Sequence, residues 1–215
     1  MIAKNSPLKL PALETTRLFI RPFVMDDLMD AHNLFDNELH EAETGSEKMD
    51  TLSERGRWLE WIVLNYRQLA ILKQPPYGDR AIVLKSTGKL IGSCGYVPCL
   101  SAFEQLPGIT AGQPSDRPTR YTAEFGLFYA ISPPHRRHGY AAEATQALID
   151  YAFEHLKLKR IIATTAYDNI ASIGVMKKLG MRIEKNPQAE PPWLQIVGVL
   201  DFTPFDPGTA SSIPE

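Results

Sequence analysis

Hydrophobic positions near the start of the chain repeat first at the spacing of a strand and then at the spacing of a helix. Leu18 and Ile20 alternate with charged neighbours, which predicts a half-buried strand over 16–21. Apolar residues then recur at helical spacing over 28–35, behind two aspartates at the positive end of that helix. We therefore expect a strand followed by a helix.

A second helix follows. Thr51 and Glu54 have the spacing of a capping box, and apolar residues recur on one face from Trp58 until two prolines end the pattern at 75–76. Trp58 lies on the apolar stripe and is expected in the core. Trp61 is expected nearer to any groove beside this helix.

The pattern then changes to short apolar runs at 81–84 and 90–97, joined by Ser-Thr-Gly-Lys, which predicts a β-hairpin. The next segment, 101–120, contains three prolines and two glycines. It is too polar and too interrupted for a regular element, so we expect a long surface loop inserted into the domain.

The second half of the chain alternates strands and helices. This order predicts a crossover unit with two parallel strands, and the earlier hairpin predicts antiparallel pairing, so the fold class is α/β with a mixed sheet. The expected elements are strands at 123–131, 160–166, 181–184 and 193–202 and helices at 140–156 and 172–179. We expect one domain at 14–202, an N-terminal extension at 1–13 and a tail at 203–215.

Composition narrows the class of protein. A chain of 215 residues, 44% hydrophobic and with a net charge of −2, can bury one core and has no global field to hold nucleic acid. No apolar run is long enough to cross a membrane or to form a secretory signal, so we expect no membrane partner and a cytoplasmic location. Cys94 and Cys99 lie inside and at the end of one apparent strand, where a bridge between them would distort the strand, so reduced thiols are expected.

The candidate chemistry lies at 132–141, between a strand and a helix. A helix start presents unpaired N–H groups with partial positive charge, which bind phosphate through the main chain. Gly139 permits close approach or a positive φ, and Arg136 and Arg137 add cationic donors that suit a diphosphate. A plain strand-to-helix turn with solvated arginines remains an alternative. His135 and His138 lack a third ligand, so no metal site is predicted.

The spacing Arg136-x-x-Gly139-x-Ala141 resembles the R/Q-x-x-G-x-G/A signature of the GNAT superfamily of acetyl-CoA-dependent N-acetyltransferases. Segments at 14–22, 123–126, 139–144 and 169–180 look like the branch that acetylates ribosomal-protein N-termini. The resemblance covers about residues 14 to 202. A P-loop is excluded because no Gly-Lys-Ser/Thr follows the glycine, and a dinucleotide fold lacks its glycine pattern.

The resemblance implies the GNAT fold, a mixed and mostly antiparallel sheet that is splayed between two central parallel strands and flanked by helices. It also implies acetyl-CoA as cosubstrate. The implied cofactor-binding residues are Phe128, Tyr129, Ala130 and Ile131 for the pantetheine arm, Arg136, Arg137, His138, Gly139, Tyr140, Ala141 and Ala142 for the pyrophosphate, and Asn169 for the pantetheine side. Asn169 also suits an ordinary helix cap.

Amide formation from a thioester needs a neutral amine, donors for the oxyanion and a proton source for the thiolate. The resemblance places Glu124 as the carboxylate that takes the ammonium proton, although pairing with a neighbour would suit it equally. Many family members have a tyrosine where this chain has Met176. Ser172 therefore becomes the candidate partner of the thiolate, and a packing role for this small residue stays open.

These residues favour an N-acetyltransferase that acts on a primary amine, either a protein N-terminus or a small molecule, by direct attack in a ternary complex. The family's first two helices flank the acceptor groove, so Trp58 and Trp61 are candidates for its wall. A non-catalytic acyl-CoA-binding module and an interaction domain without cofactor remain alternatives. The protein is expected as a monomer or homodimer.

Overall fold

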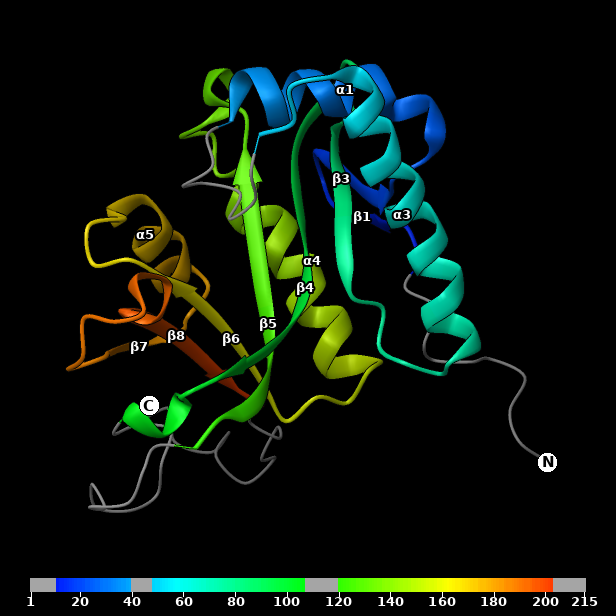
Figure 1. Ribbon diagram of the computed structural model, residues 1–215. Helices are drawn as coiled ribbons and strands as arrows, with labels where there is room; N and C mark the ends of the chain where they lie inside the picture. Colours follow the sequence, from blue (N-terminus) through cyan, green and yellow to red (C-terminus); the bar gives the residue numbers. More distant parts are fainter. Residues whose placement is uncertain (1–10, 40–47, 107–119, 203–215) are drawn as a thin grey trace, which may run out of the picture.

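The computed structural model describes residues 11–39, 48–106 and 120–202, so the predicted tail at 203–215 and the segment 107–119 of the predicted loop lie outside the described residues. Eight strands form one sheet in the order β1-β2-β3-β4-β5-β6-β8-β7 (Figure 1). The strands are β1 (Leu13–Glu14), β2 (Leu18–Pro22), β3 (Gly78–Leu84), β4 (Leu90–Ser101), β5 (Thr122–Ile131), β6 (Arg160–Thr165), β7 (Arg182–Lys185) and β8 (Ile196–Asp201).

All neighbouring strands pair antiparallel except β5 and β6, which are parallel. The expected mixed, mostly antiparallel α/β sheet is therefore confirmed. The hairpin of β3 and β4 is confirmed too. No helix among the described residues is long and apolar enough to cross a membrane.

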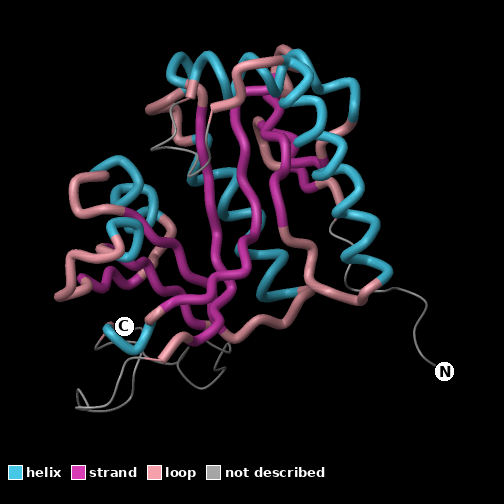
Figure 2. Tube along the Cα trace, in the orientation of Figure 1, coloured by secondary structure: helices cyan, strands magenta, loops and turns pink. Residues whose placement is uncertain are grey.

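Helices cover both faces of the sheet (Figure 2). The helical segments are η1 (Met25–Asp27), α1 (Leu28–His32), η2 (Asn33–Glu38), α3 (Leu52–Ile71), η3 (Phe103–Gln105), η4 (Pro133–His135), α4 (Tyr140–Glu154), α5 (Ile170–Lys178) and η5 (Pro192–Leu194). One face packs on α4 and α5, and the opposite face packs on α1, η2 and α3. The capping box at Thr51 and Glu54 forms as predicted, because each side chain accepts the other's backbone N–H.

The start of the predicted surface loop belongs to the core. Ser101 ends β4, and Ala102, Phe103 and Leu106 are buried, with Phe103 and Leu106 packing against β6 and β8. The expectation of a polar surface loop was therefore wrong for 101–106. The prolines and glycines later in the segment led us to expect a loop throughout, although three residues near its beginning are apolar and buried.

Strands β5 and β6 touch at one place and then diverge. β5 pairs with β4 along its whole length, yet it pairs with β6 only at Gly126 and Ile162. Figure 1 shows the two strands meeting low in the sheet and opening upward as a V. A Cβ at position 126 would lie 2.6 Å from the Cys99 sulfur, so any larger residue at this crossing would force the Cys99 side chain to move. Beyond Gly126, one edge of β5 has no β6 partner in the ladder.

Neither cysteine forms a disulfide. Cys94 is fully buried on the α4 side of β4, and burial raises the pKa of its thiol to about 12. A thiol with such a pKa stays protonated and unreactive at neutral pH. This agrees with the expectation of reduced, packed thiols.

Candidate active site

The loop between β5 and α4 turns its backbone toward the start of the helix. Gly139, the N-cap of α4, has a φ of 82°, and Arg137 has a φ of 64°. Among the described residues, the N–H groups of 137–142 have no carbonyl acceptor, and the first to find one is Glu143, which donates to Gly139. The unpaired amides and the positive helix end together suit an anion.

Two cations flank this loop. An ideal Cβ on Gly139 would lie 3.4 Å from Lys178 Nζ and 3.6 Å from Arg17 Nη2. Arg17 also pairs with Glu143 at 2.6 Å and lies over the Tyr140 ring at 4.5 Å. A shallow hollow, which we call the α4 hollow, opens here and is lined by Arg17, Gly139, Ala142, Glu143, Gln146, Lys178 and Leu179.

Sequence analysis did not assign Arg17 and Lys178 to this site, because the two residues are far apart in the chain. Both lie inside segments that carry the family resemblance, 14–22 and 169–180, so a signal was present. The charge of Lys178 adds to the field of the α4 N-terminus, whereas the charge of Arg17 is compensated by Glu143.

The other side chains of the loop brace it. Arg136 Nε donates to the carbonyl of Ile131 at 2.9 Å, which fastens the loop to the end of β5. His138 Nδ1 lies 2.8 Å from the Arg136 carbonyl, and the imidazole stacks on Tyr140. No group of three metal-ligating side chains occurs in the described parts of the chain.

The segment Phe128–Ile131 forms the upper part of β5, where the strand has left β6. Phe128 and Ala130 face the α1–α3 side and line a cavity. Tyr129 and Ile131 face the opposite side and pack with α4. This alternation follows from the period of a strand.

Tyr129 bridges the opening between β5 and α5. Its hydroxyl lies 2.9 Å from Ser172 Oγ and donates to the Ser172 carbonyl at 3.1 Å. Burial raises the pKa of Tyr129, and the Ser172 hydrogen bond offsets part of that effect, so the phenol stays protonated at neutral pH. Asn169 caps α5, because its Oδ1 accepts the Ser172 N–H at 3.0 Å. Met176 is fully buried.

Glu124 lies before the crossing at Gly126. Its Oε1 is 3.5 Å from Arg160 Nη1, and Arg160 Nε also binds Asp201 at 2.6 Å. Tyr129, the partner of Ser172, is five residues further along β5, roughly 16 Å at about 3.3 Å per residue. The structure therefore does not bring Glu124 and Ser172 together, and the pairing with a neighbour that was left open is observed.

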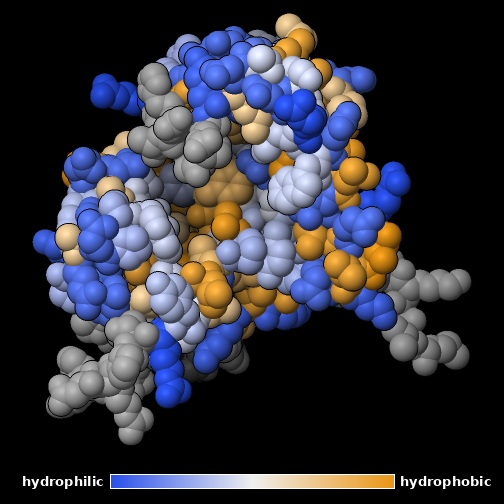
Figure 3. All heavy atoms as spheres, viewed as in Figure 1, coloured by the Kyte–Doolittle hydropathy of each residue, from blue (hydrophilic) through white to orange (hydrophobic). Residues whose placement is uncertain are grey.

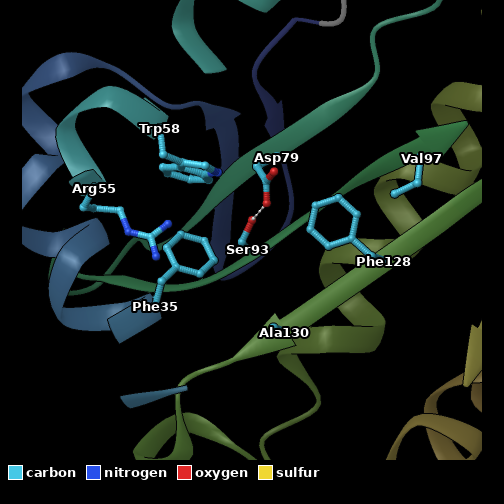
Figure 4. A pocket seen from close by; sticks show the side chains of 8 residues that line it. All are labelled: Phe35, Arg55, Trp58, Asp79, Ser93, Val97, Phe128 and Ala130. Atoms are coloured by element: carbon cyan, nitrogen blue, oxygen red, sulfur yellow. Dashed lines mark hydrogen bonds between the residues drawn. The ribbon is translucent and has the colours of Figure 1, made fainter. Parts of the chain in front are cut away.

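A cavity of about 220 Å³ lies on the α1–α3 side of the sheet, and we call it the aromatic cavity. Figure 3 shows a hollow with a partly hydrophobic floor in this region. Its walls are Phe35, Arg55, Trp58, Asp79, Ser93, Val97, Phe128 and Ala130 (Figure 4). A Cβ at Gly95 would lie 2.9 Å from the Phe128 ring, so this glycine makes room for that wall.

Of the two tryptophans, Trp58 lines the cavity and Trp61 is 60% exposed. Trp61, which was expected nearer to the acceptor groove, does not line this cavity. Trp58 is at once a core residue and a wall, since it packs edge-on against Phe23 and Phe35. The helical spacing of apolar residues predicted that Trp58 is buried. It could not show that this buried face of α3 borders a cavity.

Asp79 is the residue in this cavity that sequence analysis missed. Its Oδ1 accepts a hydrogen bond from Ser93 Oγ at 3.1 Å, and its carbonyl accepts one from the Tyr66 hydroxyl. Burial raises the pKa of the Asp79 carboxyl to about 6, although the Ser93 hydrogen bond acts in the opposite direction. The available signal was one acidic residue two positions before the apolar run 81–84.

Comparison with known proteins was decisive for the family. The sequence profile described as acetyltransferase (GNAT) domain matches residues 17–182, more than half of the chain. This chain belongs to the GNAT acetyltransferase family. The GNAT domain makes it an acyltransferase. The family resemblance and the fold inferred from the loop and strand motifs are thereby confirmed.

Relatives of this GNAT domain include two Bacillus subtilis proteins. The uncharacterized N-acetyltransferase YnaD is 47% identical over 64 residues, 30% of this chain and 36% of YnaD. The uncharacterized N-acetyltransferase YoaA is 29% identical over 175 residues, 81% of this chain and 84% of YoaA. The structure of Mycobacterium smegmatis RimJ in complex with CoA-disulfide has a TM-score of 0.57 at 18% identity, covering 86% of this chain and 81% of RimJ. At that identity the likeness shows the fold alone.

Proposed function

We propose that this protein transfers an acetyl group from acetyl-CoA to a primary amine by direct attack in a ternary complex. One observation carries the proposal. The unpaired amides of 137–142 stand at the start of α4 beside Lys178 and the Arg17–Glu143 pair, and the unpaired edge of β5 leads to them. A diphosphate with an extended amide-bearing arm matches both features, because the arm can extend the ladder of β5.

The residues present fit acetyl-CoA. The amides from Arg137 to Ala142 would bind the pyrophosphate, with Lys178 and Arg17 beside it. The edge of β5 from Phe128 to Ile131 would bond the pantetheine amides. Asn169 would contact the same arm with its amide nitrogen, since its oxygen caps α5. Arg136 and His138 would act by bracing the loop.

The chemical step joins the amine nitrogen to the thioester carbonyl carbon and breaks the carbon–sulfur bond. The departing thiolate needs a hydrogen-bond donor. Ser172 is proposed for this task, and Tyr129 strengthens the case because its protonated hydroxyl is bonded to Ser172 Oγ. The pair can replace the tyrosine that the family often has at the position of Met176.

Glu124 is the carboxylate proposed from the sequence to take the ammonium proton. Glu124 contacts Arg160, which also binds Asp201, and this contact supports a structural role for Glu124. We keep it as one of two candidates. The other is Asp79 in the aromatic cavity.

The test is acetyl-CoA binding and thiol release with purified protein. Gly139→Asp places a side chain and a negative charge among the proposed phosphate ligands at a position of positive φ. We expect acetyl-CoA binding to be lost, with the fold retained by circular dichroism. Gly88→Asp is the matched control, because Gly88 also has positive φ but nothing lies within 4 Å of its added Cβ.

Undiminished affinity in folded Gly139→Asp would contradict the proposed site. If wild-type protein binds acetyl-CoA but releases no thiol with any amine, the chain is a binding module and not a transferase. Thermal stabilisation by CoA distinguishes this module from a domain that binds no cofactor.

A further inference from the structure

The aromatic cavity contains one carboxylate without a cationic partner. Arg55 also lines it, but its Nε and Nη2 are bonded to the two oxygens of Asp36 at 2.9 and 2.6 Å. Asp79, in contrast, accepts a hydrogen bond from the Ser93 hydroxyl and forms no ion pair with any residue that the structure describes. The cavity therefore presents one uncompensated negative charge, and the charge complementary to it is a cation.

The walls around Asp79 are apolar and aromatic. Figure 4 shows its carboxylate between Trp58 and Phe128, with Phe35, Val97 and Ala130 completing the enclosure. Such walls exclude water and strengthen the attraction between a carboxylate and a cation. Aromatic rings also attract cations directly. Arg55 already lies 4.7 Å from the Trp58 ring and 5.0 Å from the Phe35 ring, so of the aromatic rings described in the lining, Phe128 carries no cation.

The cavity also borders the segment of β5 proposed to carry the thioester arm. Phe128 and Ala130 turn their side chains into the cavity, and the backbone edge of the same residues is the edge that β6 leaves. The cavity thus extends from Asp79 on β3 across β4 to Phe128 on β5, the strand whose far edge is proposed to carry the arm.

We propose that Asp79 is the catalytic carboxylate of the acceptor site, which binds a primary ammonium group on an apolar carbon and takes its proton. The proposal rests on the proposed function. No described residue of the cavity lining offers a free cation for a carboxylate on the acceptor, because Asp36 occupies Arg55. Amines without a neighbouring carboxylate are therefore preferred over free amino acids.

The protons and bonds balance without any further reactant. The ammonium gives one proton to Asp79, and the neutral nitrogen attacks the thioester carbonyl carbon. The carbon–nitrogen bond forms, the carbon–sulfur bond breaks, and the second nitrogen proton ends on the thiolate through Ser172 or water. Asp79 then releases its proton to solvent. A carboxyl whose pKa is raised to about 6 is better matched to this task at neutral pH than an exposed one.

The experiment compares three acceptors that share one ring: phenethylamine, L-phenylalaninamide and L-phenylalanine. We expect the first two to be acetylated with a kcat/KM at least tenfold above that of the free amino acid. If phenethylamine has the highest kcat/KM, a small amine is indicated as the natural acceptor. If L-phenylalaninamide has the highest value, a peptide N-terminus is indicated. Both support the proposal, and an equal or higher value for L-phenylalanine overturns it.

Asp79→Asn keeps the shape and the Ser93 contact but removes the charge. We expect kcat/KM at pH 7 to fall about hundredfold, which is within the rate contribution typical of a general base. Acetyl-CoA affinity should be unchanged. Asp150→Asn is the control, since Asp150 is exposed on α4 and far from this face of the sheet. Wild-type kinetics in Asp79→Asn overturn the proposal.

Calorimetry separates failure of this proposal from failure of the proposed function. Phenethylammonium is titrated into wild-type protein and into Asp79→Asn, each saturated with CoA. If no amine releases thiol, the transferase function fails, yet binding that weakens at least tenfold in Asp79→Asn still supports the cation site. Equal binding by both proteins, or binding by neither, overturns it.

Discussion

The Tyr129 hydroxyl on β5 lies 2.9 Å from Ser172 Oγ on α5, so one hydrogen bond spans the opening where β5 and β6 diverge. The two residues come from β5 and α5, which lie on either side of the opening. Each hydroxyl is therefore held in place by a hydrogen bond to the other element. This contact places a protonated phenol behind the serine that was proposed as partner of the thiolate.

The first prediction concerns this pair. Ser172→Ala should lower kcat by about tenfold, roughly 1.4 kcal/mol, with a loss that does not shrink as pH rises. Tyr129→Phe should lower kcat less, because Ser172 keeps its hydroxyl, and the double variant should lose no more than Ser172→Ala. Steady-state kinetics with a saturating amine measure all three. Additive losses would show that Tyr129 acts independently of Ser172.

The second prediction concerns the cations beside Gly139. Lys178→Ala should weaken acetyl-CoA binding about tenfold and reduce its salt dependence, because a phosphate loses one charge-assisted contact. Lys177→Ala is the matched control, since Lys177 is also exposed at the end of α5 but does not line the α4 hollow. Calorimetry at two salt concentrations reads out both variants. Equal affinities of the two would remove Lys178 from the phosphate site.

The third prediction concerns the buried pair behind the aromatic cavity. Asp36 accepts from Arg55, from the Met49 N–H at 2.9 Å and from His32, and the Arg55 hydrogen bond keeps the pKa of Asp36 low despite burial. Asp36→Asn leaves the buried Arg55 charge unpaired, which should cost about 3–5 kcal/mol of unfolding free energy. Urea unfolding measures it. The double variant Asp36→Leu/Arg55→Met should recover much of the loss, and a smaller effect of Asp36→Asn alone would contradict a buried ionic pair.

The order of strands and helices could be predicted because each element carries its own period and its own end signals. The capping box at Thr51, the glycine at 139 and the crossover from β5 to β6 are all local in sequence. The phosphate loop is local as well, which explains why its glycine and its helix start were found. Features of this kind need no knowledge of distant parts of the chain.

The aromatic cavity could not be predicted in this way. Asp79 on β3, Trp58 on α3 and Phe128 on β5 meet only after the sheet has formed, and none of them has a spacing that refers to the others. A lone aspartate in a strand is also common. Conversely, Glu124 was singled out because of the strand it occupies, but the register of β5 and β6 sets it opposite Arg160.

The fourth prediction separates the two candidate carboxylates. Deprotonation of an ammonium by a carboxylate matters most at low pH, where free amine is scarce, so loss of the true base lowers kcat/KM most there and less as pH rises. We expect that profile from Asp79→Asn. Glu124→Gln should keep the wild-type profile, because its contact with Arg160 gives it a structural task. The reverse assignment follows if Glu124→Gln alone shows the low-pH loss.

The last prediction is a stability effect of Asp79 that does not depend on activity. Its pKa is about 6 in the folded protein against an ordinary value of 3.8, with burial as the largest cause. The folded state therefore binds more protons than the unfolded state between these values, and stability falls as pH rises through that window. The charged and titratable groups around Asp79 are Arg55 and Tyr66 on α3, Arg80 next to it on β3, Cys94 on β4, and Asp36 with His32 behind Arg55.

Asp79→Asn removes this penalty, so the variant should be more stable than wild type at pH 7.5. The gain is on the order of 3 kcal/mol at most, the value of about two pKa steps at 1.36 kcal/mol each. It should shrink toward zero near pH 4, where the wild-type carboxyl is protonated in the folded state and half protonated in the unfolded one. Urea unfolding at both pH values measures the gain, with Asp150→Asn expected to show none. A variant less stable than wild type at pH 7.5 would mean that the Asp79 carboxylate stabilises the fold. In that case the burial of Asp79 beside three aromatic rings would not have the unfavourable free energy that is expected of an unoccupied cation site.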